Sequence, residues 1–134
     1  HKGEISFPGG SKDATDPDLL FTALRETQEE MGINPEEVEV LGKTDVTPTQ
    51  TEFLIWPFVE IIDHPYKVSL SKSEVECVLE IPLSDLFSTN YRGDEIKSLK
   101  DQLQRVPVYS FDGNVVYGAT ARILDNLAEL IEAA

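Results

Sequence analysis

The sequence predicts an α/β or α+β protein in which a mixed β-sheet lies between helices. Two stretches, residues 17–31 and 119–133, carry the apolar spacing of helices. Between them lie several stretches rich in β-branched and aromatic residues, bounded by Gly, Pro, Asn or Asp, as strands are. Because strands and helices interleave, we expect helices on both faces of the sheet. The 134 residues fit one domain, spanning 1–134.

The first expected elements are a short strand and a helix. Residues 5–7 are predicted to form a strand that enters a turn at Pro8-Gly9-Gly10. The helix is expected to run from about 17 to 31, with Asp16 as its N-cap and Pro17 in its first turn. Gly32 suits the left-handed position that ends a helix.

The remaining elements follow from local patterns. Strands are expected at 38–46, 51–62 and 77–81, and a short helix near 85–88. Pro57 within the second strand indicates an edge or a bulge. Asp112-Gly113 predicts a hairpin between strands at 106–111 and 114–117. The last helix, 119–133, carries an apolar stripe formed by Ile123, Leu124, Leu127, Leu130 and Ile131.

Composition excludes several classes of function. With 25 acidic and 11 basic residues the net charge is −14, which argues against non-specific nucleic-acid binding, since that depends on Lys and Arg. An anionic substrate stays compatible if divalent cations bridge it to the acids. The single cysteine, Cys77, allows no internal disulfide and is expected to be a small core residue. No apolar run approaches the ~18 residues of a membrane span.

Acidic residues with helical spacing indicate chemistry. Glu26 precedes Glu29 by three residues and Glu30 by four, so these carboxylates are neighbours on the surface of the expected helix. They would repel one another unless hard cations lie between them, and Mg²⁺ binds through carboxylates and substrate phosphates. Arg25 lies four residues before Glu29 and could pair with it.

This stretch resembles the Nudix box, in which a glycine precedes Arg-Glu-x-x-Glu-Glu-x-Gly. Here that core is intact from Arg25 to Gly32, and Gly10 is the upstream glycine. The spacing is one residue longer than the common form, Asp16 replaces a Glu, and Thr27 stands at an aliphatic position. A solvated acidic helix face would not explain the Arg and both glycine elements together. The resemblance implies the Nudix α/β/α sandwich and a diphosphatase using Mg²⁺ or Mn²⁺.

A second resemblance narrows the expected substrate. The signature of coenzyme A diphosphatases is similar to a pattern near the start of this chain, in which Gly3 and three further residues precede Phe7-Pro8-Gly9-Gly10. The segment before the last helix of that family is similar to Tyr117-Gly118-Ala119-Thr120-Ala121. The resemblance implies hydrolysis of coenzyme A or its thioesters to 3′,5′-ADP and 4′-phosphopantetheine or its acyl form. The family's upstream Leu-Leu-Thr-x-Arg is absent, so an N-terminal segment is expected to be missing.

The start His1-Lys2 is similar to peroxisomal members of that family. The resemblance therefore implies a peroxisomal location. The chain ends in Glu132-Ala133-Ala134 rather than a Ser-Lys-Leu tail, so the cytoplasm is the alternative. The sequence leaves the oligomeric state open.

Roles follow for the candidate metal and base residues. Glu26 and Glu30 are the first choices as metal ligands, and Glu29 is the next, with an ion pair to Arg25 as its other role. A main-chain carbonyl of Gly9 or Gly10 could complete the shell, as in relatives. The general base that takes a proton from the attacking water is expected to be Glu26 or Glu74, and a surface acid is the other reading of Glu74.

The expected substrate contacts lie before the helix. The bare backbone of Gly9 and Gly10 allows phosphates to approach closely. Phe7 belongs to the same element, and Lys2 could attract the 3′-phosphate. Three rival interpretations remain. The first is a Nudix hydrolase of ADP-ribose, NADH or an oxidised nucleotide, the second is a Nudix module that binds a nucleotide without cleaving it, and the third is a messenger-RNA cap hydrolase, against which the shortage of basic residues counts. The intact carboxylates of the box count against the second.

Overall fold

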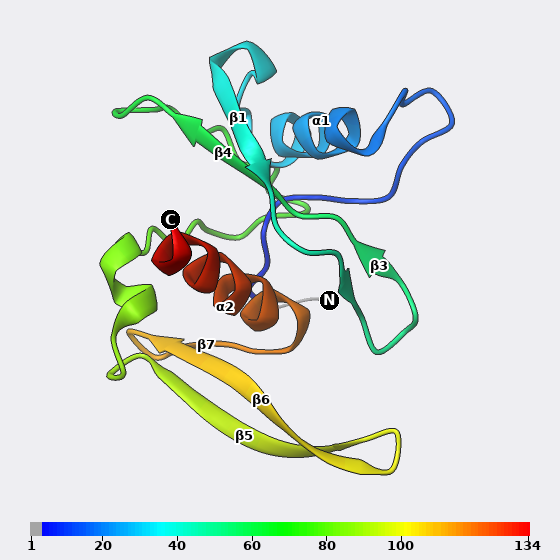
Figure 1. The fold of residues 1–134 in the computed structure, drawn as a ribbon. Coiled ribbons are helices and arrows are strands. Elements are labelled where there is room, and N and C mark those ends of the chain that lie inside the picture. The colour runs from blue at the N-terminus through cyan, green and yellow to red at the C-terminus, as the bar shows by residue number, and fades with distance from the viewer. Residues whose placement is uncertain (1–3) are drawn as a thin grey trace. The chain divides into compact units, whose positions relative to one another are not determined.

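The computed structural model describes residues 4–134 (Figure 1). It combines two α-helices, two short 3₁₀ helices and small antiparallel sheets, so the α+β class is confirmed and is consistent with an α/β/α sandwich. The described residues divide into two compact units. We call residues 7–43 with 58–79 the α1 unit, and residues 4–6, 44–57 and 80–134 the α2 unit.

Helix α1, Leu19–Met31, is the main element of the α1 unit. Its N-cap is Asp18, which has an extended backbone and accepts a hydrogen bond from the Phe21 N–H, so the expectation that Asp16 caps the helix is wrong. Asp16 is instead buried and bound by other side chains. Gly32 ends the helix in the left-handed conformation, with φ 71°, as expected.

A two-stranded antiparallel sheet completes the α1 unit. Strand β1, Val38–Lys43, follows the 3₁₀ helix η1, Pro35–Glu37, and pairs with β4, Phe58–Ile62. The register runs from Val38 opposite Ile62 to Lys43 opposite Phe58, with an irregularity between Val40 and Gly42. β1 is therefore shorter than the strand expected at 38–46.

The predicted strand over 51–62 is divided between the two units. Strand β3, Leu54–Ile55, pairs with β2, Thr47–Pro48, in the α2 unit, whereas β4 begins only at Phe58. Pro57 lies at the break, and a proline has no N–H to give to a ladder. Its carbonyl instead accepts a hydrogen bond from the Thr44 N–H at 3.2 Å.

The α2 unit contains the larger sheet. Strands β5, Arg92–Leu99, β6, Gln102–Phe111, and β7, Asn114–Val116, pair antiparallel in that order. The Asp112-Gly113 hairpin is confirmed, since both residues have positive φ, 50° and 83°. β5 was not predicted from the sequence, because its turn to β6 uses Lys100 and Asp101, at φ 51° and 62°, rather than a glycine.

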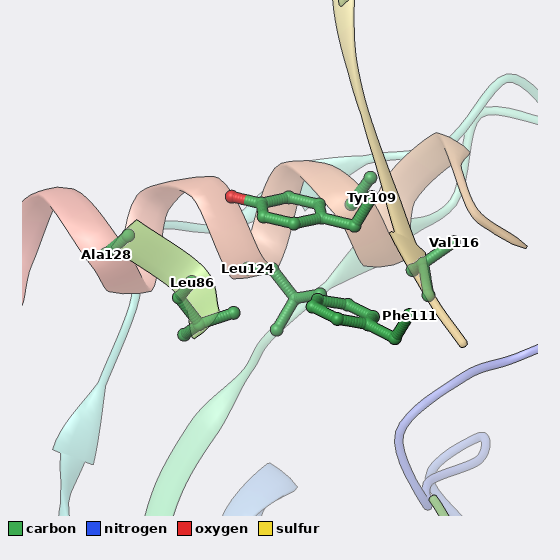
Figure 2. Close-up of a cluster of buried hydrophobic side chains, with 7 residues drawn as sticks. Leu86, Tyr109, Phe111, Val116, Leu124 and Ala128 are labelled. Atoms are coloured by element: carbon green, nitrogen blue, oxygen red, sulfur yellow. The ribbon is translucent and has the colours of Figure 1, made fainter. Parts of the chain in front are cut away.

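The core of the α2 unit lies between this sheet and helix α2, Gly118–Ala133 (Figure 2). Its buried members come from β6, β7, α2 and the 3₁₀ helix η2, Leu83–Phe87: Leu86, Tyr109, Phe111, Val116, Ala121, Leu124 and Ala128. Ile123 is also buried, but Leu130 and Ile131 are exposed, so the predicted stripe extends too far toward the end of α2.

Two expected strands are absent from the described residues. Residues 5–7 and 77–81 form no ladder, and Cys77 is exposed rather than a core residue. Strands also pair only antiparallel within 4–134, without the parallel pairs of a mixed sheet. A parallel pair needs a strand on each side of a crossover, and the segment before α1 is not a strand. No described helix is long and apolar enough to span a membrane.

Candidate active site

Arg25 organises the acidic face of α1. Its Nε and Nη2 atoms donate to the two oxygens of Asp16 at 3.1 and 2.9 Å. Its Nη1 reaches Glu26 at 3.1 Å and Glu29 at 3.3 Å. The predicted pair with Glu29 is thus present, as one contact among several.

Asp16 anchors Arg25 from the loop before the helix. The carboxylate is 3% exposed and also accepts hydrogen bonds from the Thr22 hydroxyl at 2.8 Å and the Asp13 N–H at 2.9 Å. The guanidinium of Arg25 holds the pKa of Asp16 well below its usual range, and the same contact raises the pKa of Arg25. Both side chains therefore stay charged, and the guanidinium is fixed beside the glutamates.

Glu30 is tied to the glycine turn. The Gly9 N–H donates to Glu30 Oε2 at 2.9 Å, which joins the loop before α1 to its last turn. Burial raises the pKa of Glu30; the Gly9 hydrogen bond opposes the rise, and the negative charges of Glu26, Glu74 and Glu29 add to it. Glu30 thus lies within reach of the field of three other carboxylates.

Gly10 lies so close to Glu26 that any side chain at position 10 would displace the Glu26 carboxylate. A Cβ atom at Gly10 would lie 2.5 Å from both Cδ and Oε1 of Glu26. A Cβ at Gly9 would meet nothing within 4 Å. The two glycines therefore have different roles: Gly9 contributes its N–H, and Gly10 contributes space.

A loop from the other end of the α1 unit brings Glu74 toward the same helix. The Ser69 N–H donates to the Met31 carbonyl at 2.8 Å, and the Ser71 N–H donates to the Glu30 carbonyl at 2.9 Å. Glu74 follows in a turn closed on the Ser71 carbonyl at 2.9 Å. These bonds use the carbonyls that a helix end leaves free.

The donor chemistry of this face suits a divalent cation. Four carboxylates and the Gly10 main chain supply hard oxygen ligands, which Mg²⁺ prefers. Within residues 4–134, however, no three acidic, His or Cys side chains are already arranged around a common point to hold a metal. Arg25 takes up Glu26 and Glu29, so a cation would compete with the guanidinium for these two carboxylates.

Most, but not all, residues of this acidic face were predictable from the sequence. Phe7 is exposed before the glycine turn, and Lys2 lies outside the described residues. The anchoring role of Asp16 was missed, although its place at the box position of a Glu was a usable signal. Ser69 and Ser71 carried no signal, because they act through their backbone.

Comparisons with known proteins agree with the geometry. Residues 1–101 match the family described as the NUDIX domain. Over 129 residues the chain is 37% identical to a protein of Pectobacterium atrosepticum named "Uncharacterized Nudix hydrolase NudL", covering 96% of this chain and 67% of that protein. A protein of the same name from Photorhabdus laumondii is 32% identical over 98% of this chain and 71% of its own length. The protein of the same name from Citrobacter koseri is 38% identical over 96% of this chain and 67% of its own length.

Proposed function

Because this chain belongs to the Nudix family and is therefore a Nudix hydrolase, we propose that it cleaves the diphosphate bond of coenzyme A or acyl-coenzyme A. The products are 3′,5′-ADP and 4′-phosphopantetheine or its acyl form. One domain, spanning residues 1–134, carries the activity in this proposal. The relatives align with 96–98% of the chain, which supports that extent.

The observation that carries the proposal is the contact between the Phe7-Pro8-Gly9-Gly10 element and the box helix. Gly9 donates to Glu30 at 2.9 Å, and Gly10 leaves room for the Glu26 carboxylate. The element that resembles a coenzyme A diphosphatase signature therefore touches two of the carboxylates that would carry the chemistry. A substrate read by this element would have its diphosphate beside them.

Each residue of the site has a proposed task. Nudix hydrolases generally use divalent ions such as Mg²⁺ or Mn²⁺, and such ions polarise phosphoryl oxygens and lower the pKa of a bound water. Glu26, Glu29 and Glu30 would hold the ions, with the Gly10 carbonyl. Arg25 keeps Glu26 and Glu29 in place, and Asp16 keeps Arg25 in place.

Hydrolysis requires a base for the attacking water. As the water oxygen bonds to one phosphorus, the bond from that phosphorus to the bridging oxygen breaks, and the water's proton must go to an acceptor. Glu74 is our choice for that acceptor, with Glu26 as the alternative. The two backbone hydrogen bonds that tie Ser69 and Ser71 to α1 support Glu74, because they hold its loop near Glu30.

The organisms of the relatives bear on where the enzyme is located. The three named relatives are bacterial proteins, which gives the peroxisomal location no support. We therefore favour the cytoplasm, the alternative, as the location. The substrate partner is a small molecule, and the excess of acidic residues argues against nucleic acid.

The proposal is tested by hydrolysis of coenzyme A with Mg²⁺, beside ADP-ribose and NADH, with Glu30→Gln as the inactive control. Fastest cleavage of coenzyme A to 3′,5′-ADP, lost in the variant, would support both substrate and site. Preferential cleavage of ADP-ribose or NADH would overturn the substrate but keep the reaction. If the folded chain cleaves none of the three at saturating Mg²⁺, the proposal of coenzyme A hydrolysis is wrong.

A further inference from the structure

Strand β5 forms the outer edge of the sheet in the α2 unit. The order is β5-β6-β7, so β6 covers one side of β5 and, among residues 4–134, no strand covers the other. β5 runs from Arg92 to Leu99 in continuous register with β6. A long edge strand presents unpaired N–H and C=O groups, which are a template for another strand.

Apolar side chains accompany this edge on one face. Ile96 is 67% exposed and Leu103 is 79% exposed. Leu103 pairs with Ser98, and Ser98 lies two residues from Ile96, so Ile96 and Leu103 share a face of the sheet. This face continues beyond the part covered by α2, since Tyr109 on the same face is fully buried there.

Two charged side chains of opposite sign flank Ile96 in the sequence and lie on the opposite face of the sheet. Glu95 and Lys97 flank Ile96 in sequence and share the opposite face, where the Lys97 amine lies 3.8 Å from the Glu95 carboxylate. A strand with one acid and one base placed symmetrically about an apolar residue is complementary to a reversed copy of itself. The pattern is centred on Ile96.

We propose that β5 pairs antiparallel with β5 of a second copy of this chain, with Ile96 opposite Ile96 on a two-fold axis. In this register Glu95 lies opposite Lys97 of the second copy, and Lys97 lies opposite its Glu95. Each copy contributes the same segment, as a two-fold interface requires. The two three-stranded sheets become one six-stranded sheet.

Symmetry and charge select this register. A two-fold axis between antiparallel strands is perpendicular to the sheet and keeps every side chain on its face, so a residue must lie opposite itself. Moving the axis by one residue would place Glu95 opposite Glu95 or Lys97 opposite Lys97. Directly opposed like charges are destabilising, whereas opposed unlike charges stabilise a pair of strands. Of the three central registers, only that on Ile96 avoids a like-charge pair on the axis.

The experiment is sedimentation velocity of the full chain at concentrations up to about 1 mM. Each copy carries a net charge of −14, so the runs use about 0.15 M salt, where repulsion between distant charges is screened. We expect a concentration-dependent species of twice the 14.9 kDa mass. A protein that stays monomeric over the whole range would overturn the proposal.

Charge reversal tests the register itself. Glu95→Lys or Lys97→Glu alone should raise the dimer dissociation constant at least about tenfold, because both cross-strand pairs become like-charged. An equimolar mixture of the two variants should recover association, since each acidic edge then meets a basic one. Glu129→Lys reverses a charge on the exposed side of α2, outside β5, and should leave dimerisation unchanged.

These comparisons separate the interface from a folding defect. Recovery in the mixture requires both variants to be folded, and circular dichroism of each alone checks this. Equal weakening by Glu129→Lys, or dimers that persist in both single variants without gaining in the mixture, would refute pairing through β5. None of the substituted residues belongs to the proposed active site, so diphosphatase activity should stay within about twofold of the unmodified chain.

Discussion

Replacing Gly10 by Ala should remove most of the activity while leaving the fold intact. The new Cβ would lie 2.5 Å from both Cδ and Oε1 of Glu26, and 3.0 Å from Oε2, where ordinary contacts are 3.4–4 Å. Gly10 does not need a positive φ, so its backbone can accept Ala. The clash must therefore be relieved by the carboxylate, which lies at the end of a flexible side chain.

The size of the effect follows from the displacement. Moving the Glu26 carboxylate from 2.5 to about 3.4 Å shifts it by about 1 Å, and a misplacement of this size in a catalytic group can lower the rate by about 10²-fold. Glu26 is also held by Arg25 at 3.1 Å, so the shift disturbs that contact too. Stability should change by no more than about 0.5 kcal/mol, as for surface substitutions in general.

Gly9→Ala is the matched control. Its Cβ would meet nothing within 4 Å, and it keeps the N–H that binds Glu30. The measurement is kcat for coenzyme A hydrolysis across a Mg²⁺ titration, with thermal unfolding of each variant. We expect Gly9→Ala to stay within a few-fold of the unmodified chain. If Gly10→Ala were folded and as active as Gly9→Ala, the carboxylate of Glu26 would not be needed at its present position.

Three further predictions concern stability and loop placement. Leu124→Ala, in the buried face of α2, should cost about 2–4 kcal/mol in chemical denaturation, whereas Leu130→Ala, 45% exposed, should cost less than about 0.5; equal losses would contradict the described core. Asp125→Asn disrupts the two hydrogen bonds that Arg92 on β5 donates to the Asp125 carboxylate, at 2.6 and 3.0 Å. The substitution should lower the free energy of unfolding by about 1–3 kcal/mol at pH 7. Arg92 lowers the pKa of Asp125, so this stabilisation is complete above the unfolded pKa of about 3.9 and is lost as the pH falls through the folded value. The free energies of unfolding of Asp125→Asn and the unmodified chain should therefore converge below about pH 4. A difference that stayed constant with pH would be inconsistent with the shift. Gly32→Ala and Gly113→Ala both place Ala at positive φ, and each should cost about 1–2 kcal/mol of stability. At Gly32 the new Cβ would also lie 3.0 Å from the Ser69 backbone, so only Gly32→Ala should lower kcat as well. Equal kcat values in the two variants would show that the loop through Ser69 does not depend on this contact.

Much of the candidate site could be predicted from the sequence because it lies on one helix. The spacing of Glu26, Glu29 and Glu30 is a local property, and the 3.6-residue period turns it into a shared face. The terminal position of Gly32 was equally local, since its left-handed φ favours glycine. The pairing of Arg25 with Glu29 was also correct, because four residues separate neighbours on a helix.

Contacts over longer sequence distances were not predictable in this way. Asp16 was predicted to cap the helix because Pro17 follows it. Its buried carboxylate instead forms an ion pair with Arg25, nine residues later in the sequence. The strands expected at 5–7 and 77–81 do not form among the described residues. A strand needs a partner, and local composition does not tell whether one is present.

The sequence by itself determined the reaction family, the acidic helix face and the Asp112-Gly113 hairpin, because each depends on residues a few positions apart. Tertiary structure alone decided that Gly9 binds Glu30, that Gly10 makes room for Glu26, and that the loop through Ser69 and Ser71 carries Glu74 to the helix end. These contacts join residues 16 to 41 positions apart, and each depends on a backbone N–H or on the absence of a side chain. A sequence pattern describes side chains and does not describe backbone donors or empty space, so these contacts can be identified only in the folded chain.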